Sequence, residues 1–364
     1  MKTARLCTFV GGTAAFSFLM HVMNKFELKE DEHYTAFLEA VKERPPGVPL
    51  LTVSNHCSPL DDPGVLVGML PASVTMRPER MRWTICAQEI CFKWTAASAA
   101  FGSAKVMPIA RGEGIDQRQL LNYYRRLSAG GWCHIFPEGH CEQDGSLGGR
   151  AAGPSRDKHG RLKWGVGKLI AHATVPPVVI PIYHTGMANV MPLNPFTRKI
   201  LKAMPRAGHT ITARAGGAIK FDDLIESHVE LHGPLRKLEP VKEFANNDSS
   251  SSSSSSVSTN GERSIEEGGA AATRGGGGRV DLVKGEAGDR MWRSTAAERQ
   301  LYSKIARRIE DALLDLEAET RRDMGDAYPG FPQESAAMLR IVGLLEDDDA
   351  SGGGRNGGGD GRQT

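Results

Sequence analysis

The sequence predicts an α/β fold in which helices flank a mixed, mostly parallel sheet. Between Val48 and Arg214, short apolar runs of strand type alternate with segments that have the periodicity of a helix. This alternation is typical of sheets whose parallel strands are connected by helices. The expected strands are residues 49–53, 82–87, 105–109, 132–136, 178–183 and 209–214. The expected helices are residues 31–42, 63–69, 116–127 and 164–173.

The N-terminus carries an apolar run, residues 6–23, with no charged residue other than the titratable His21. The side-chain charges that precede Glu27 are all positive, which suits an anionic membrane surface. A bilayer requires about 20 apolar residues, so we expect residues 1–26 to anchor the chain, across the bilayer or in one leaflet. A buried core helix is the alternative. Asn24 and Lys25 stand where a signal peptide would need small residues, so the segment should be retained.

The composition changes sharply after the expected sheet. Serine and glycine tracts fill residues 246–290 and leave too little apolar surface for a core. We expect a single domain over residues 27–245, a disordered insertion over 246–290, and a helix within 291–325. Leu301, Ile305 and Ile309 place an apolar stripe on that helix, which we expect over residues 295–322. The acidic and glycine-rich residues 326–364 are expected to be a disordered tail.

Charge and cysteine content exclude some classes of protein. Lys+Arg 45 against Asp+Glu 43 gives a net charge of +2, so no overall field favours nucleic acid as a partner. No two cysteines form a Cys-x-x-Cys pair, and we expect all six to be free thiols and no metal to be bound. Cys133, His134, His140 and Cys141 would be the ligands of a zinc site, but no second ligand pair stands at a recognisable spacing.

His56 and Asp61 directly follow the first of the expected strands. In α/β folds, reactive groups gather at the carboxyl ends of the strands. Five residues along a helix would place the two side chains about 140° apart, so pairing requires a bend, which Pro59 permits. Asp61 has a second interpretation, as the cap of a following helix. Ser58 is a weaker candidate nucleophile; the chain has no Gly-x-Ser-x-Gly motif, so a covalent acyl-enzyme is not expected.

A second polar motif, Phe136-Pro137-Glu138-Gly139, follows the strand at residues 132–136. A turn of this composition places a carboxylate and free backbone amides at the same edge of the sheet as His56. An ordinary structural turn is the alternative, because Pro137 and Gly139 alone would account for it.

The two motifs, in this order, resemble the glycerolipid acyltransferases, which carry an Asn-His-x4-Asp block and a downstream Phe-Pro-Glu-Gly block. Residues 105–111 and 179–182 resemble the family's two other blocks. Within that superfamily, the local amino-acid sequence resembles the tafazzin branch at residues 52–56, 61–63, 87–92, 132–139, 163–170 and 184–192. The spacer between Gly139 and Lys163 is longer than in the family, and residues 246–290 look like an insertion.

The resemblance implies an acyltransferase domain in which His56 is the general base and Asp61 orients it. It implies that Glu138 and Gly139, with Phe136 and Pro137 beside them, hold the glycerol or phosphate region of the acceptor. Arg111, Arg161 and Lys163 would contact phosphate, although solvated surface charge is the alternative for each.

Tafazzin resemblance further implies transfer from a phospholipid donor to a lysophospholipid acceptor such as monolysocardiolipin, with no cofactor. It implies a mitochondrial membrane location, inner or outer, facing the intermembrane space. An acyl-CoA-dependent lysophospholipid acyltransferase is the enzymatic alternative. A non-catalytic lipid-binding membrane protein is the alternative from another class. The sequence indicates no oligomeric state.

Overall fold

The computed structural model describes residues 2–143, 147, 162–237, 293–329, 332 and 337–338. The insertion expected at residues 246–290 and most of the expected tail lie outside this part of the chain.

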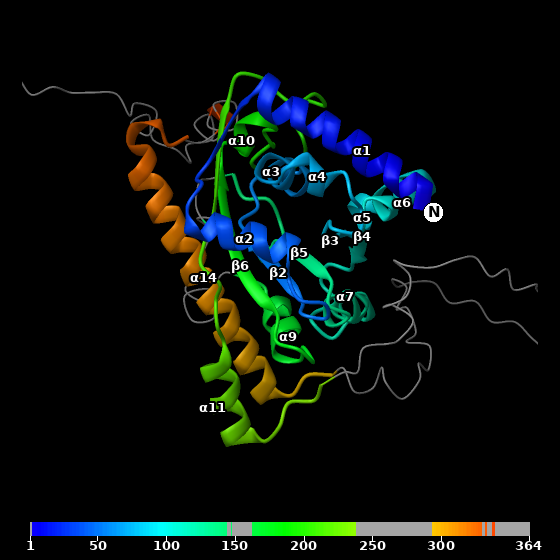
Figure 1. The fold of residues 1–364 in the computed structure, drawn as a ribbon, viewed down its shortest axis with the longest axis vertical. Helices are drawn as coiled ribbons and strands as arrows, with labels where there is room; N and C mark the ends of the chain where they lie inside the picture. Colours follow the sequence, from blue (N-terminus) through cyan, green and yellow to red (C-terminus); the bar gives the residue numbers. More distant parts are fainter. Residues whose placement is uncertain are drawn as a thin grey trace, which may run out of the picture.

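A seven-stranded sheet forms the centre of the molecule, with the order β1-β7-β6-β2-β5-β3-β4 (Figure 1). The β6–β7 pair is antiparallel and the other five pairs are parallel, so the predicted mixed, mostly parallel sheet is confirmed. The strands are β1 (Lys25–Leu28), β2 (Leu50–Ser54), β3 (Trp83–Ala87), β4 (Val106–Ile109), β5 (Trp132–Ile135), β6 (Val178–Thr185) and β7 (Thr210–Ala215).

The three central strands determine where polar groups collect. Every residue of β2 and β5 is buried, as expected for strands covered on both faces. Ser54 at the end of β2 pairs with Ile182 of β6, and Val53 pairs with Ile135 of β5. The loops that follow β2 and β5 therefore leave the sheet at the same edge, beside the end of β6.

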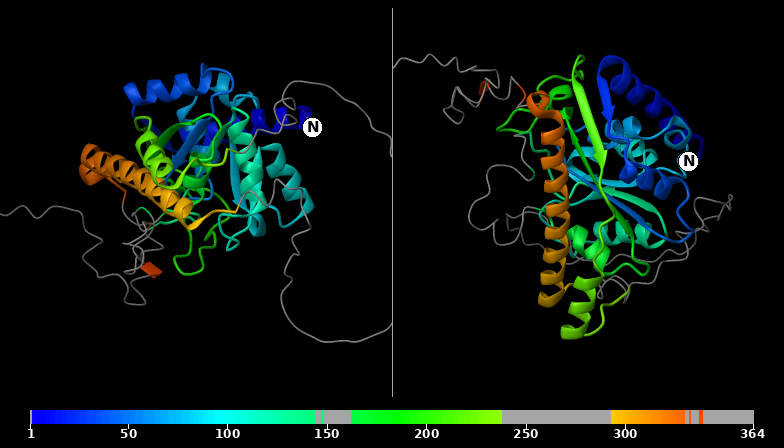
Figure 2. Two further views of the ribbon diagram at one scale, coloured as in Figure 1. Left: turned by 90° about the horizontal axis from the view of Figure 1, so that it is seen from below. Right: turned by 60° about the vertical axis from the view of Figure 1, so that its left-hand side comes forward.

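Helices cover both faces of the sheet and build a separate core on each (Figure 2). On one face pack α1 (Lys2–Phe18), α2 (Glu32–Lys42) and α3 (Asp61–Met69). On the other pack α7 (Arg118–Ser128), α9 (Gly165–Ala171) and α14 (Ala296–Met324). The other described helices are α4 (Ala72–Thr75), α5 (Gln88–Cys91), α6 (Thr95–Ser103), α10 (Met187–Val190) and α11 (Asp222–His232), with η1 (Leu19–Met23) and η2 (Gly325–Ala327).

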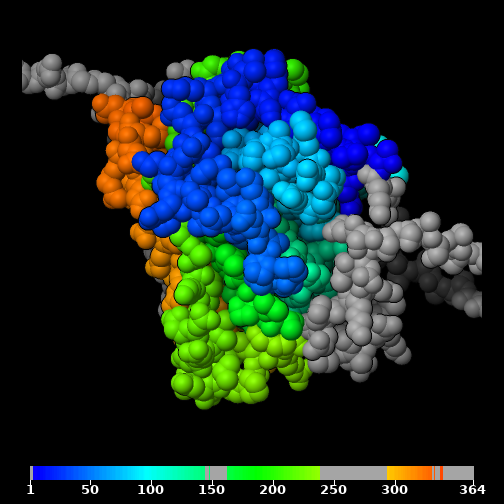
Figure 3. All heavy atoms as spheres, viewed as in Figure 1, coloured from blue at the N-terminus to red at the C-terminus, as the bar shows by residue number. Residues whose placement is uncertain are grey.

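The N-terminal apolar run lies along the domain. Helix α1 continues into the π-helix η1, and β1 begins two residues later. Phe9 and Met20 are buried in the core, and the Thr8 hydroxyl lies 2.9 Å from that of Ser103 on α6. Thr3–Met23 is long and apolar enough to cross a membrane. Only 22% of its most apolar stretch is buried within the protein. The helix thus has a packed side and a side that faces outward along the rim of the molecule (Figure 3).

Helix α14 brings the C-terminal part of the chain onto the domain. Its N-terminus has a capping box, in which the Thr295 hydroxyl and the Glu298 carboxylate each accept from the other's backbone N–H. The predicted apolar stripe is buried against α9, α11 and β6. An apolar stripe of this kind could pack on the domain, on a partner protein or on a membrane. The structure assigns it to the domain core.

Two features differ from the sequence prediction. Strand β1 and helices α6 and α11 were not expected. The prediction of six free thiols is wrong, because Cys86 and Cys91 form a disulfide. Cys86 stands near the end of β3 and α5 turns back at once, which brings the two Cα atoms to 6.1 Å, within disulfide range. The free cysteines of the described chain are Cys7, Cys57, Cys133 and Cys141.

Two glycines of α9 offer a matched test of the α9–α14 contact. A Cβ at Gly167 would lie 2.4 Å from the backbone oxygen of Tyr302, whereas a Cβ at Gly165 would make ordinary contact with Leu120 at 3.6 Å. We expect Gly167→Ala to lower the free energy of unfolding by about 1–3 kcal/mol through overpacking. Gly165→Ala should be neutral or stabilising, since alanine favours helix by up to about 1 kcal/mol. Urea unfolding of both variants measures this; equal stability would contradict the close approach.

Candidate active site

The loop after β2 is tied to the end of β6 by one side chain. The Asn55 side chain donates to the His184 carbonyl at 2.8 Å and accepts from the His184 N–H at 3.0 Å. These two hydrogen bonds resemble those between paired residues of neighbouring strands, and they fix the direction in which the chain leaves the sheet. His56 and Cys57 follow directly.

Asp61 folds back onto this loop. Its side chain is fully buried, and Oδ2 accepts from the backbone N–H groups of Cys57 and Ser58, both at 2.7 Å. The same oxygen accepts from His56 Nδ1 at 2.9 Å. Leu60 is the N-cap of α3 and makes no side-chain cap bond. Of the two interpretations of Asp61, the contact with His56 is the one that the structure contains.

The imidazole of His56 is held on one face and contacted at both nitrogens. Phe136 stacks on it at a ring separation of 4.2 Å, and Glu138 Oε1 accepts the His56 backbone N–H at 2.7 Å. Cys141 Sγ lies 3.2 Å from Nε2. Burial lowers the pKa of His56, but Cys141 and Asp61 together outweigh it and raise the pKa to about 10. The side chain is 20% exposed, so one edge remains open to a substrate.

The Phe136–Gly139 motif forms a tight turn. The Gly139 N–H donates to the Phe136 carbonyl at 3.1 Å, and Gly139 has a φ of 77°, which favours glycine. Lys163 donates its backbone N–H to Pro137 at 2.7 Å, and its aliphatic chain covers Gly139. Glu138 is buried, with its carboxylate turned toward the His56 backbone.

The other residues singled out from the sequence lie elsewhere. Arg111, after β4, is half exposed and 3.6 Å from Glu89 at the edge of the sheet. Ser58 is fully buried, and its hydroxyl accepts the Leu60 N–H at 3.3 Å. Arg161 lies outside the described residues. The structure thus brings His56 and Asp61 together with the Phe136–Gly139 turn and Lys163, but not with Arg111.

Several residues of the site were not singled out for catalysis or substrate binding. Cys141 entered only as an unlikely zinc ligand, and Gln143 and His184 carried no signal of a role in the site. Gln143 donates to the carbonyls of Cys57 and Met191 and accepts the Leu193 N–H, at 2.7–3.0 Å. These contacts join segments that are far apart in sequence, which is why no local motif marks them.

Comparison with known proteins identifies the family. A family model described as Acyltransferase matches residues 36–185, a range that includes His56, Asp61 and Glu138. N-acylphosphatidylethanolamine synthase of Arabidopsis thaliana is 37% identical over 209 residues, 57% of this chain and 69% of that protein. The chain belongs to the glycerolipid acyltransferase superfamily. It is therefore an acyltransferase.

Tafazzins are among the relatives of this acyltransferase. The Dictyostelium discoideum protein is 36% identical over 186 residues, 50% of this chain and 59% of that protein. The Drosophila melanogaster tafazzin is 32% identical over 189 residues, 52% of this chain and 45% of that protein. The match therefore spans about half the length of the tafazzins. A solved structure, the PlsC acyltransferase of Thermotoga maritima, is only distantly similar, with 14% identity, a TM-score of 0.35, and coverage of 62% of this chain and 79% of that chain.

A cleft in the acyltransferase opens beside His56. Its lining includes Glu138 from the turn after β5, Tyr183 and His184 from β6, and Tyr328 from the segment after α14. The hydroxyls of Tyr183 and Tyr328 lie 2.7 Å apart. The C-terminal part of the chain therefore contributes to the wall of the cleft.

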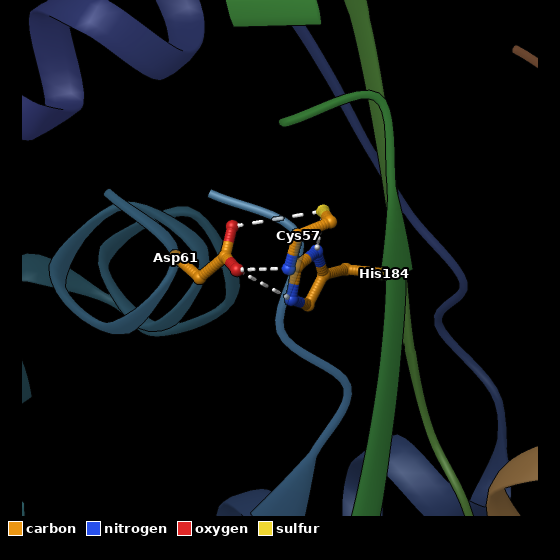
Figure 4. A group of neighbouring side chains, drawn as sticks. All are labelled: Cys57, Asp61 and His184. Carbon is orange, nitrogen blue, oxygen red and sulfur yellow. Dashed lines mark hydrogen bonds and ion pairs between the residues drawn. The ribbon is translucent and has the colours of Figure 1, made fainter. Parts of the chain in front are cut away.

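Cys57, Asp61 and His184 form a compact polar cluster behind His56 (Figure 4). Cys57 Sγ lies 3.8 Å from Asp61 Oδ1 and 3.8 Å from His184 Nδ1, and His184 Nε2 donates to the Asn55 carbonyl at 3.1 Å. Burial, with Asp61 beside it, raises the pKa of the Cys57 thiol well above its usual range, so the thiol can donate to its neighbours. Cys57 and His184 therefore lie against the Asp61 carboxylate, and His184 Nε2 is 3.8 Å from Oδ2, the oxygen that also contacts His56.

Proposed function

We propose that this acyltransferase transfers a fatty acyl chain from a phospholipid to a lysophospholipid hydroxyl without CoA, and that monolysocardiolipin is the acceptor. The tafazzin relatives support this substrate class. The observation that carries the chemistry is the contact of 2.9 Å between His56 Nδ1 and the buried Asp61 carboxylate, beside a cleft. This contact orients the imidazole so that Nε2 is the nitrogen available for proton transfer.

In the proposed reaction, the unprotonated form of His56, which a pKa of about 10 makes the minor form at neutral pH, accepts at Nε2 the proton of the acceptor hydroxyl as its oxygen attacks an acyl carbonyl. Asp61 holds the ring and stabilises the imidazolium that forms. The proton then passes from Nε2 to the departing lysophospholipid oxygen. Because one oxygen ester replaces another, the exchange requires no external source of energy.

The turn after β5 is the proposed floor of the acceptor site. Glu138 lines the cleft and accepts the His56 backbone N–H, and Phe136 stacks on the His56 ring. Pro137 and Gly139 belong to the same turn. Lys163 packs over this turn with its charged end exposed, so we propose that it contacts a lipid phosphate. Arg111 is the more distant candidate for that contact.

A second acceptor class follows from one observation. The Arabidopsis relative, of which this chain covers 69%, is named for the synthesis of N-acylphosphatidylethanolamine. The same base could remove a proton from an ethanolamine amine instead of a hydroxyl, because both nucleophiles lose a proton as they attack. The products differ, since an amide survives mild alkali that cleaves an ester.

The outward side of α1 is the proposed membrane contact. Leu6, Val10 and Phe18 of α1, and Val22 of the η1 segment that continues it, are 42–69% exposed. Since the other side of α1 packs on the domain, we propose that it lies in one leaflet and does not cross the bilayer. A mitochondrial membrane is the location that the tafazzin relatives suggest.

Removal of the base tests the proposed mechanism. We expect His56→Ala to lower the transfer rate by about 10²- to 10⁴-fold, because a positioned base contributes that much. Asp61→Asn should lose a large part of the same factor, since an amide no longer fixes the tautomer. His232→Ala, which removes an exposed imidazole on α11, is the control. If a folded His56→Ala protein transfers acyl groups at the parent rate, His56 is not the general base.

A single vesicle assay tests the acyl donor and the acceptor. Vesicles contain phosphatidylcholine labelled in its acyl chain, with monolysocardiolipin or phosphatidylethanolamine, each with and without acyl-CoA. We expect label in cardiolipin without CoA, as an alkali-labile ester. Strict dependence on acyl-CoA would contradict the transacylase proposal. An alkali-stable product from phosphatidylethanolamine would establish the second acceptor class.

Charge placed on the outer side of α1 tests the membrane contact. Each apolar methylene that enters the membrane stabilises binding by about 0.8 kcal/mol, so Phe18→Asp with Val22→Asp should weaken sedimentation with vesicles at least tenfold. The matched control is Val229→Asp with Leu231→Asp on α11, which also charges two exposed apolar residues. Equal sedimentation of the α1 variant and the parent would place the membrane contact elsewhere.

A further inference from the structure

A surface loop between α10 and β7 carries a local excess of positive charge. This basic loop, residues 194–206, contains Arg198, Lys199, Lys202 and Arg206 and no aspartate or glutamate. The whole chain has a net charge of only +2, so the four cations are a local concentration and not part of a general field. Clusters of about four to eight basic residues are typical of segments that bind anionic lipid surfaces.

The basic loop also exposes apolar side chains between its cations. Phe196, Ile200 and Met204 are 54%, 49% and 74% exposed. The loop is folded where it carries Phe196, because the Asn194 side chain accepts the Phe196 N–H at 3.0 Å and the Asn194 N–H donates to the Lys199 carbonyl at 2.8 Å. Apolar groups flanked by cations are typical of segments that lie at a membrane surface, with the apolar groups inserted and the cations at the headgroups.

One end of the basic loop is joined to the segment that continues α1. The Asn24 side chain donates to the Arg206 carbonyl at 3.0 Å and accepts the His209 N–H at 3.0 Å. The Gly208 N–H donates to the Met23 carbonyl at 2.8 Å. Figure 3 shows the green part of the chain at the top of the molecule, beside the blue atoms of α1. The cations of the loop therefore lie next to the apolar side of α1 that we propose to enter the membrane.

The other end of the basic loop is joined to the rim of the cleft. The Arg198 guanidinium lies 3.0 Å from the Glu142 carboxylate. The Gln143 side chain donates to the Met191 carbonyl and accepts the Leu193 N–H, just before the loop begins. Glu142 and Gln143 both line the cleft. A surface that binds the loop therefore holds the mouth of the cleft close to that surface.

Helix α11 exposes apolar side chains in the opposite electrostatic setting. Val229 and Leu231 are 37% and 73% exposed. The helix contains four carboxylates and no lysine or arginine. Exposed apolar area thus does not distinguish α11 from the basic loop, but charge does, because an anionic surface attracts the loop and repels α11.

We propose that the basic loop docks on the anionic surface of a phospholipid bilayer, next to the outward side of α1. Phe196, Ile200 and Met204 enter the boundary between headgroups and acyl chains, and the four cations contact lipid phosphates. The loop supplies the recognition of charge, whereas α1 supplies the larger apolar area. This inference extends the proposed membrane contact and does not depend on which lipid accepts the acyl group.

The first test measures the contribution of charge. The full-length parent and Lys199→Gln with Lys202→Gln are sedimented at low salt with vesicles of phosphatidylcholine, alone or mixed with phosphatidylglycerol. Each basic residue at an anionic surface contributes roughly fivefold in affinity. We therefore expect the double variant to bind the mixed vesicles about tenfold or more weakly than the parent, and the neutral vesicles as the parent does. Lys220→Gln with Lys304→Gln, which removes two exposed cations outside the loop, should match the parent.

The two kinds of vesicle separate this inference from the proposed role of α1. Phe18→Asp with Val22→Asp should weaken binding to both kinds, whereas loss of the two loop cations should remove only the preference for anionic vesicles. An unchanged preference in the loop variant, or a parent without any preference, would overturn the inference. The proposals for α1 and for acyl transfer would then still stand, because neither depends on the charge of the loop.

The second test measures insertion of the loop. Phe196→Ser with Met204→Ser should weaken binding to the mixed vesicles by about fivefold or more, because less apolar area enters the membrane. The matched control is Val229→Ser with Leu231→Ser on α11, which should bind as the parent does. Circular dichroism confirms that each variant is folded. Equal weakening by both pairs of substitutions, or by neither, would exclude the basic loop as an inserted segment.

Discussion

A carboxylate buried among apolar helices is costly unless its charge is compensated, and Asp61 is such a group. One of its oxygens receives two backbone N–H groups and an imidazole N–H. To supply these donors, the chain between His56 and Asp61 must bend back on the first turn of α3. The ring orientation of His56, with Nδ1 toward the carboxylate and Nε2 away from it, then follows from the position of one carboxylate.

The order of the strands in the sheet determines where the bend between His56 and Asp61 lies. Because β2 lies between β5 and β6, the loops after β2 and β5 meet beside the end of β6. Asn55 joins the β2 loop to His184 of β6, and Glu138 of the β5 loop accepts the His56 N–H. Gln143 then closes the loop that carries Cys141. Each polar contact thus fixes a loop that the parallel sheet has already brought close.

Much of this arrangement can be predicted from the sequence, because it depends on local patterns. The central strands are short, mostly apolar runs, and the apolar stripe of α14 repeats at helical spacing. Strand β1 was missed because its four residues, Lys25–Leu28, alternate charged with apolar and lie at an edge. Helix α6 was missed because its alanines and serines form no apolar stripe, and none of its residues is buried.

The site was predictable where its residues are close in sequence. His56 and Asp61 are five residues apart, and their pairing follows from a motif. The contact between Cys141 and His56 joins residues 85 positions apart, and only the folded chain reveals it. The Cys86–Cys91 disulfide was missed although its cysteines are also five residues apart, because their pairing depends on the turn from β3 into α5, which no sequence motif marks.

The central claim is that Asp61 fixes the imidazole of His56 through Nδ1, and NMR of protein labelled with ¹⁵N at histidine tests it most directly. The account predicts that Nδ1 of His56 keeps its proton on titration through neutral pH and that the ring titrates well above its ordinary pKa of about 6.5. It also predicts that Asp61→Asn releases the Nδ1 proton in the neutral form and lowers the pKa of the ring. A His56 ring that titrates at its ordinary pKa, or that carries its neutral-form proton on Nε2, would contradict it.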